Sequence, residues 1–265
     1  MILPAEHAAS LYDERTLAHL RSLASGTAAI ASLAGRDSVA AIVQAVRERG
    51  FTTIIPTSVA TGTEFGSLDE VHAALAYTRD VLGPDIDVLD VVRFGSPQMW
   101  AALNGRFASE VRERYGMSSP CLSCHLYVHL ARVPLALDLG GLPVITGERD
   151  THDGAIKLSQ TIDSIDAEVR VLAHAGVELL VPIREFSHAQ VDTLVPGWNP
   201  GERQLSCVHS GNYRRADGTT DYDRAAHQRY VEGFYEPAGR AIVDAWLGGD
   251  RDPDYEAIVR GVIAG

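Results

Sequence analysis

Hydrophobic positions along the chain follow two different spacings. In some stretches apolar residues recur every three or four positions, as Val39, Ile42, Val43 and Val46 do. Other stretches are short and rich in apolar or β-branched residues, and a glycine or proline stands at or near the end of each. The first spacing predicts amphipathic helices and the second predicts buried strands. Strands are expected at residues 27–33, 51–56, 86–94, 142–146 and 177–182.

Helices are expected between these strands. The chain also contains a polar, aromatic and glycine-rich stretch at 196–223, which predicts a long loop, and a helical pattern from Arg224 to the C-terminus. Strand, turn, helix and strand follow one another within about 30 residues, which is the length of a βαβ unit. The predicted helices lie at residues 12–24, 37–49, 67–82, 97–115 (one helix or two), 122–139, 167–175 and 187–194.

This alternation predicts an α/β fold with a doubly wound parallel sheet and helices on both faces. We expect a nucleotide-binding α/β domain at residues 1–195, including the N-terminal helix. The functional loop and the C-terminal helices would form an appendage at residues 196–265.

Composition and charge narrow the function classes. The 265 residues carry a net charge of −12, and no apolar run is long enough to span a membrane. The N-terminus lacks the pattern of a signal peptide, so a cytoplasmic protein is expected. Negative charge repels polyanions, which favours a small-molecule substrate over tRNA. The sequence leaves room for a homodimer.

The turn after the first strand is a candidate nucleotide-binding loop. In doubly wound sheets such a turn presents backbone N–H groups to an anion at a helix N-terminus. Gly35 permits close backbone approach, Asp37 can cap the helix or hold magnesium, and the Ser38 hydroxyl can donate to a phosphate. An ordinary helix cap is the alternative. The loop consists of Ala34, Gly35, Arg36, Asp37 and Ser38.

A second polar segment follows the fourth predicted strand, at residues 147–153, where a doubly wound fold places its chemistry. A solvated loop is the alternative interpretation. Lys157 follows closely and is the only lysine among 23 basic residues, so a compact ammonium group is either needed there or retained by chance. Asp37, Glu148, Asp153 and Lys157 are candidates for the chemical step, and Gly147 and Arg149 for nucleotide binding.

The three cysteines form a candidate metal site. Cys121 and Cys124 lie three positions apart at the start of a predicted helix, and Cys207 lies in the long loop. Three thiolates can hold a 4Fe-4S cluster with one open iron, or zinc with His125 or His209 as fourth ligand. Buried, unligated thiols are the third interpretation.

The segment Leu33 to Ser38 resembles the Ser-Gly-Gly-x-Asp-Ser loop of PP-loop ATP pyrophosphatases, with Leu33 and Ala34 in place of the family's serine and first glycine. The resemblance implies that the chain binds ATP with magnesium and adenylates a substrate. Thr57 and Ser58 would lie on the adenine side, and residues 147–153 would face the nucleotide and the substrate carbonyl.

The cysteine arrangement resembles PP-loop enzymes that insert or remove sulfur, among them tRNA thiolases. In their cluster-bearing members, cysteines at the places of Cys121, Cys124 and Cys207 hold a 4Fe-4S cluster. The resemblance implies ATP-dependent sulfur transfer to a carbonyl, with a separate sulfur donor. The alternatives are a zinc-containing PP-loop ligase that forms amides and a non-catalytic ATP-binding protein of the universal-stress type.

Overall fold

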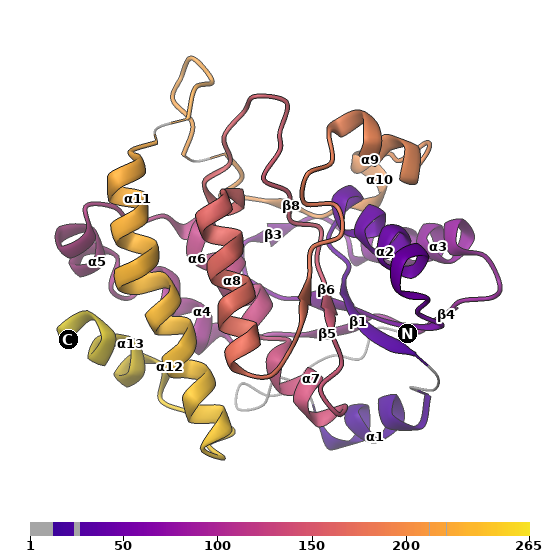
Figure 1. Cartoon of the computed structure of the whole chain (residues 1–265), viewed down its shortest axis with the longest axis horizontal. Coiled ribbons are helices and arrows are strands. Elements are labelled where there is room, and N and C mark those ends of the chain that lie inside the picture. Colours follow the sequence, from indigo (N-terminus) through magenta and orange to yellow (C-terminus); the bar gives the residue numbers. More distant parts are fainter. Residues whose placement is uncertain (1–12, 24–26, 212, 221) are drawn as a thin grey trace.

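The computed structural model describes residues 13–23, 27–211, 213–220 and 222–265. Its centre is a sheet of parallel strands in the order β4-β2-β1-β6-β7, with β5 also paired to β2 (Figure 1). Helices cover both faces, which confirms the predicted doubly wound α/β fold. The strands are β1 (Ala28–Ser32), β2 (Thr53–Val59), β4 (Asp87–Val88), β5 (Val92–Phe94), β6 (Val144–Ile145) and β7 (Leu179–Leu180).

Alternate side chains of the strands enter two separate hydrophobic clusters. In β1, Ile30 joins one cluster while Ala29 joins the other, and in β6 Val144 and Ile145 divide in the same way. This is the period of two expected for a strand that is buried on both faces. One face is covered by α2 (Arg36–Arg49), α3 (Leu68–Leu82) and α9 (His188–Leu194).

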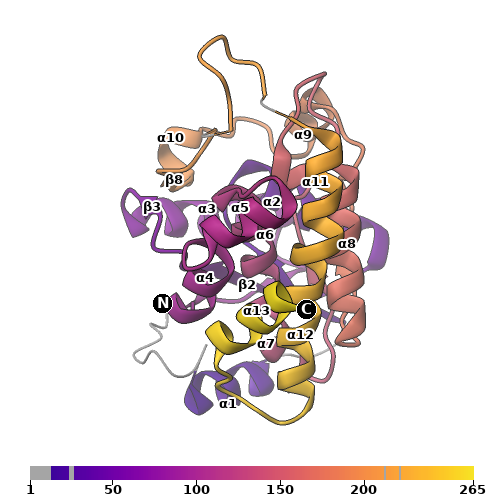
Figure 2. The same cartoon turned by 90° about the vertical axis from the view of Figure 1, so that its left-hand side faces the viewer.

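The other face carries most of the remaining helices, which share one cluster with α1 (Glu14–Leu23). The C-terminal segment α11 (Arg224–Tyr230) continues through a π-helical turn, η2 (Val231–Tyr235), into α12 (Glu236–Leu247). This long helix lies beside α8 in both views (Figure 2). The others are α4 (Pro97–Asn104), α5 (Ala108–Tyr115), α6 (Pro120–Leu130), α7 (Val133–Asp138), α8 (Ile162–His174) and α13 (Tyr255–Ala264).

The strand predicted at 86–94 is wrong as a single element, because it is divided into β4 and β5. The two pieces pair with β2 on either side of Pro56, through Ile54 and Ser58. Proline has no N–H to donate to a ladder. The partner strand is therefore interrupted where the ladder lacks a donor.

Two helix predictions also need correction. The helix expected at 122–139 divides into α6 and α7 at Arg132, because Pro134 cannot donate to a carbonyl one turn earlier. Helix α8 begins at Ile162 rather than at residue 167, since the Thr161 hydroxyl accepts a hydrogen bond from the Ser164 N–H and caps the helix there.

The segment predicted as a loop at 196–223 contains two short regular elements. One is α10 (Pro200–Arg203), and the other is β8 (Ser206–Cys207), which pairs antiparallel with β3 (Glu64–Phe65). Two-residue strands leave no periodic pattern in a sequence. The pairing of β8 with β3 places Cys207 opposite Glu64.

The π-helical turn packs closely against α5. A β-carbon added at Gly233 would lie 2.5 Å from Cε1 of Tyr115, whose ring is buried. We predict that Gly233→Ala lowers the free energy of unfolding, measured in urea, by about 1–3 kcal/mol, the usual cost of overpacking. Gly261→Ala in α13 is the matched control, because no atom lies within 4 Å of the added carbon. It should raise stability by about 0.4–1 kcal/mol. Equal effects of the two variants would contradict this packing.

Candidate functional site

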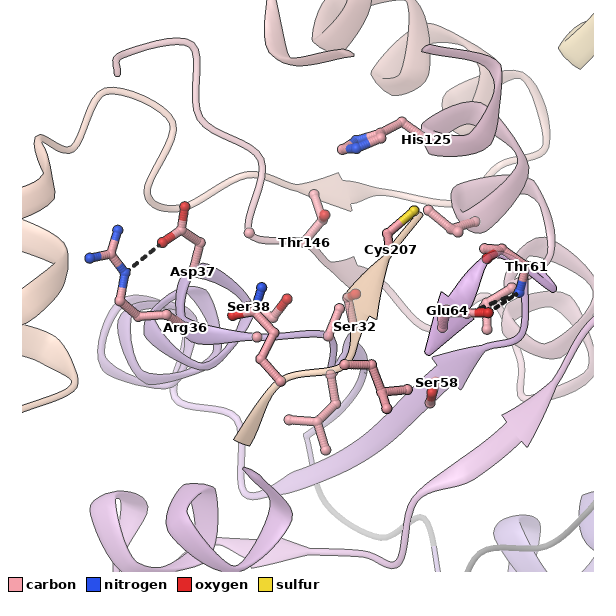
Figure 3. Close-up of a pocket in the computed structure, with 18 of the residues that line it drawn as sticks. Ser32, Arg36, Asp37, Ser38, Ser58, Thr61, Glu64, His125, Thr146 and Cys207 are labelled. Atoms are coloured by element: carbon pink, nitrogen blue, oxygen red, sulfur yellow. Dashed lines mark hydrogen bonds and ion pairs between the residues drawn. The ribbon is translucent and has the colours of Figure 1, made fainter. Parts of the chain in front are cut away.

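The strand order reverses between β1 and β6, and after these two strands the chain continues into helices on opposite faces of the sheet, α2 after β1 and α8 after β6. A cleft of about 580 Å³ opens there. Its lining includes Ala34, Gly35, Arg36, Asp37, Ser38, Ser58, Gly147, Glu148, Lys157, Cys124 and Cys207. In Figure 3, Asp37 and Ser38 lie on one side of the cleft and Cys207 and Glu64 on the other. The structure thus brings most of the residues predicted from sequence to one cavity.

The first turn of α2 forms one wall of the cleft. The helix begins at Arg36 with Gly35 as its N-cap, and no side chain caps it. Of the two roles considered for Asp37, capping this helix is therefore excluded. Its carboxylate instead accepts hydrogen bonds from Nε of Arg36 and Nε of Arg149, each at 3.0 Å. Arg149 is fully buried and does not reach the cleft, so its ion pair with Asp37 holds the Asp37 carboxylate in place.

At the switch point, Gly147 in the turn after β6 packs against the first residues of α2. A β-carbon on Gly147 would lie 2.5 Å from the carbonyl carbon of Asp37 and 2.5 Å from the backbone nitrogen of Ser38. Only a residue without a side chain allows the β6 turn to approach the start of α2 so closely. At Gly35 the close neighbour is the flexible end of the Gln204 side chain, which occupies the space of the missing β-carbon.

Lys157 lies on the cleft, and within the described residues its ammonium group has no hydrogen-bond or ion-pair partner. Burial lowers the pKa of Lys157, while the nearby Asp37 carboxylate opposes that shift. Close by, burial and the charges of Lys157 and Arg149 lower the pKa of His152 to about 4. The cleft is therefore bordered by several positive groups and can accept an anion.

Arg132 is a cleft residue that the sequence interpretation missed. Only 2% of it is exposed, and its guanidinium donates to Oγ1 of Thr57 at 2.8 Å and to Oγ of Ser32 at 3.1 Å. Burial lowers its pKa to about 10. The available signal was a lone arginine within the apolar run from Leu126 to Leu137, because such a charge is rarely buried without a purpose.

The three cysteines, all in the described part of the chain, form no disulfide. Cys121 lies in the first turn of α6 and Cys124 three residues later, and Cys207 lies on β8 close enough to affect their pKa values. Sγ of Cys121 donates to the His209 carbonyl at 3.1 Å, and Sγ of Cys124 accepts from the Trp100 indole at 3.4 Å. Burial raises the pKa of Cys121 to about 11 and that of Cys124 to about 12.

A second group of metal-ligand side chains borders the same cleft. Among the described residues, His125, His129 and Glu148 are the one set of three such side chains whose ligand atoms all lie within 4.8 Å of one another. Glu148 is buried after β6, where Gln160 Nε2 donates to its Oε2 at 2.6 Å. Glu168 lies behind His129, with its Oε1 accepting from the Tyr235 hydroxyl at 2.6 Å.

Four of the predicted site residues do not line this cleft, namely Cys121, Thr57, Arg149 and Asp153. Thr57 is fully buried and its hydroxyl donates to the Ala31 carbonyl. Arg149 is buried behind Asp37, and Asp153 is exposed and paired with His188.

The aromatic and basic residues of the 196–223 segment line two different cavities. Arg203 lines the main cleft, where its guanidinium lies over the ring of Tyr77, 4.8 Å from the centroid. Arg214 and Arg215 line a second cavity of about 360 Å³, together with Arg112 and Tyr213. Arg203 therefore borders a different cavity from Arg214 and Arg215.

Comparison with known proteins gives the family. No family model matches the chain. Over 220 residues it is 34% identical to an uncharacterised protein, MJ0009, of Methanocaldococcus jannaschii, and this match covers 81% of the chain and 79% of that protein. The chain belongs to the MJ0009 family.

A solved structure is also similar, that of a 4-thiouridine synthetase in complex with RNA and bound ATP. The TM-score is 0.49, the identity is 15%, and 91% of this chain is covered. The chain spans about half (54%) of the length of that synthetase chain. In the described residues, no helix combines the length and apolarity that a membrane crossing requires.

His152 should make stability depend on pH. Its pKa is about 4 in the folded protein, below the value of about 6.5 expected when unfolded, so between these two pH values only the unfolded chain binds the proton. The free energy of unfolding should therefore fall as pH falls from 6.5 to 4. We predict that His152→Gln flattens this part of the profile, measured by urea unfolding, by up to about 1 kcal/mol per pH unit. The control His72→Gln, at an exposed position on α3, should leave the profile unchanged. Identical profiles for both variants would disprove the assignment.

Proposed function

We propose that the protein is an ATP-dependent sulfur-transfer enzyme of the PP-loop class. In this proposal it adenylates a small-molecule carbonyl and replaces the oxygen by sulfur with the help of a 4Fe-4S cluster. The proposal rests on candidate nucleotide and metal-binding residues that meet in one cleft. The candidate nucleotide turn, Gly35 to Ser38, and two of the candidate metal ligands, Cys124 and Cys207, line one cleft although they are far apart in sequence.

Nucleotide binding is supported by the position and charge of the cleft. It lies at the switch point of the sheet, where doubly wound proteins bind their ligands, and the uncapped N-terminus of α2 borders it. Lys157, Arg36 and Arg132 add positive charge. Asp37 is positioned by two arginines, and a carboxylate has about four acceptor sites, so it retains capacity to bind magnesium.

The cysteines fit a cluster better than a single zinc ion. Sulfur ligands at about 2.3 Å from one zinc lie about 3.8 Å apart, whereas the three thiols are not a set within 4.8 Å of one another. A larger inorganic group accommodates a wider separation. The raised pKa values of Cys121 and Cys124 mean that binding any metal must release protons.

The proposed reaction has two steps. The substrate carbonyl oxygen attacks the α-phosphorus of ATP, the bond to pyrophosphate breaks, and an adenylate forms. Lys157 and Arg36 would stabilise the charge that develops on the departing pyrophosphate. Cys121, Cys124 and Cys207 would hold the cluster, whose chemistry when bound would be to provide sulfur at the sulfide level. Sulfide would replace the oxygen at the activated carbon, and that oxygen would leave with AMP. A sulfur donor must then restore the sulfur.

A small-molecule substrate is favoured over tRNA by size and charge. The cleft volume of about 580 Å³ is in the range of small-molecule sites, roughly 300–1,000 Å³. The net charge of −12 opposes binding of a polyanion.

The nucleotide part is tested by calorimetry with magnesium and a non-hydrolysable ATP analogue. Lys157→Met should weaken binding about tenfold or more, because a charge-assisted hydrogen bond contributes about 1.5–3 kcal/mol. Arg106→Met, which removes a surface cation paired with Glu256, is the control and should bind as the wild type does. Products of the reaction should be AMP and pyrophosphate. A wild-type chain that binds no nucleotide would refute this part, and binding without turnover would favour the universal-stress alternative.

The cluster part is tested by anaerobic purification with iron, sulfide and zinc quantification. The wild type should contain about four irons and four sulfides per chain and show the absorption of an iron–sulfur protein. Cys207→Ala should lose them, while the neighbouring control Ser206→Ala should not. Stoichiometric zinc without iron would favour the amide-forming alternative. No bound metal would reduce the cysteines to packing residues.

A further inference from the structure

We propose that His125, His129 and Glu148 bind one divalent transition-metal ion at a site separate from the three cysteines. The inference goes beyond the proposed function and does not depend on it, because it uses none of the three thiols.

The ligand atoms of the three side chains all lie within 4.8 Å of one another, close enough to share one metal ion. Oε1 of Glu148 lies 3.0 Å from Nδ1 of His125 and 3.4 Å from Nε2 of His129. Nitrogen and oxygen ligands at about 2.0–2.1 Å from a tetrahedral ion lie about 3.3 Å from one another. The two histidines are four positions apart on α6, which places them on one helix face.

A second observation points to a missing partner. His129 is 1% exposed, and neither of its ring nitrogens has a hydrogen-bond partner. Oε2 of Glu168, also buried and without a hydrogen bond, lies 3.4 Å from Nε2 of the same histidine. An unsatisfied buried polar group costs about 1–3 kcal/mol. A cation among these atoms would satisfy the ring nitrogen that faces both carboxylates.

The surroundings indicate which kind of ion the site takes. Two imidazoles and one carboxylate favour zinc, iron, cobalt or nickel over magnesium or calcium, which prefer oxygen ligands. Nε2 of Gln160 donates a hydrogen bond to Oε2 of Glu148 and so orients the carboxylate without touching the ion. The His125 side chain is 31% exposed and borders the cleft, so a further coordination position would open toward a bound substrate.

The experiment uses the full chain with Cys121, Cys124 and Cys207 all replaced by serine, so that thiolates cannot contribute. Co²⁺ is titrated and followed by visible absorption. We expect one equivalent to bind with ligand-field bands and without thiolate charge-transfer bands. In this background His125→Ala and Glu148→Gln should each weaken binding by more than the roughly 10- to 100-fold that loss of an outer-shell partner costs. Gln160→Ala should fall within that range.

His174→Ala is the matched control, because His174 also pairs with a carboxylate, Asp244, at an exposed site without a third ligand. It should bind Co²⁺ as the parent does. Two results would overturn the proposal: a folded triple-serine variant that binds no cobalt, or His125→Ala and Glu148→Gln variants that bind cobalt as tightly as the triple-serine parent. The two histidines would then not form a metal site without the cysteines.

If the triple-serine variant does not fold, X-ray absorption on the zinc-loaded wild-type chain separates nitrogen and oxygen ligands from sulfur. Loss of the nitrogen and oxygen component in Glu148→Gln supports the site, because zinc held by the three thiolates and His125 would keep its nitrogen ligand in that variant. Persistence of the component in Glu148→Gln refutes the site.

Discussion

The backbone of Gly147 lies against the peptide between Asp37 and Ser38, and the arrangement of the cleft depends on this contact. It exists because β1 and β6 are adjacent parallel strands, with Ile30 opposite Val144 and the Ile30 N–H bonded to the Pro143 carbonyl at 3.0 Å. Both strands end at the same edge of the sheet. Side chains from the two turns therefore meet there, and Arg149 reaches Asp37.

Ionisable side chains buried beside the cleft are a second feature of the structure. Arg132, Arg149, Glu148 and Glu168 are all buried there. Burying an ion costs several kcal/mol, and apolar side chains of similar volume are often as stable or more so. Packing alone does not account for four such groups in one region. Their concentration next to the switch point is typical of a functional site, where residues needed for chemistry lower the stability of the fold.

The cysteine side of the cleft depends on contacts between distant segments. Cys207 is held by the short ladder between β8 and β3, where it lies opposite Glu64, and its Sγ is 3.3 Å from Oγ1 of Thr63. Cys124 comes from α6, on the opposite side of the sheet from α2. The cleft therefore joins elements from both faces of the sheet, which permits two kinds of ligand to meet.

The sequence by itself determined the parallel α/β architecture, because strand and helix periods are local properties that side-chain burial enforces along each element. It also indicated the turn at Gly35, the polar segment after β6 and the cysteines, since these residue types stand at strand or helix ends. It did not reveal the division of β4 from β5, the roles of Arg132 and Glu168, or the grouping of His125, His129 and Glu148. These features arise from contacts between residues far apart in the chain, and only the packed tertiary structure decides which buried polar groups become neighbours.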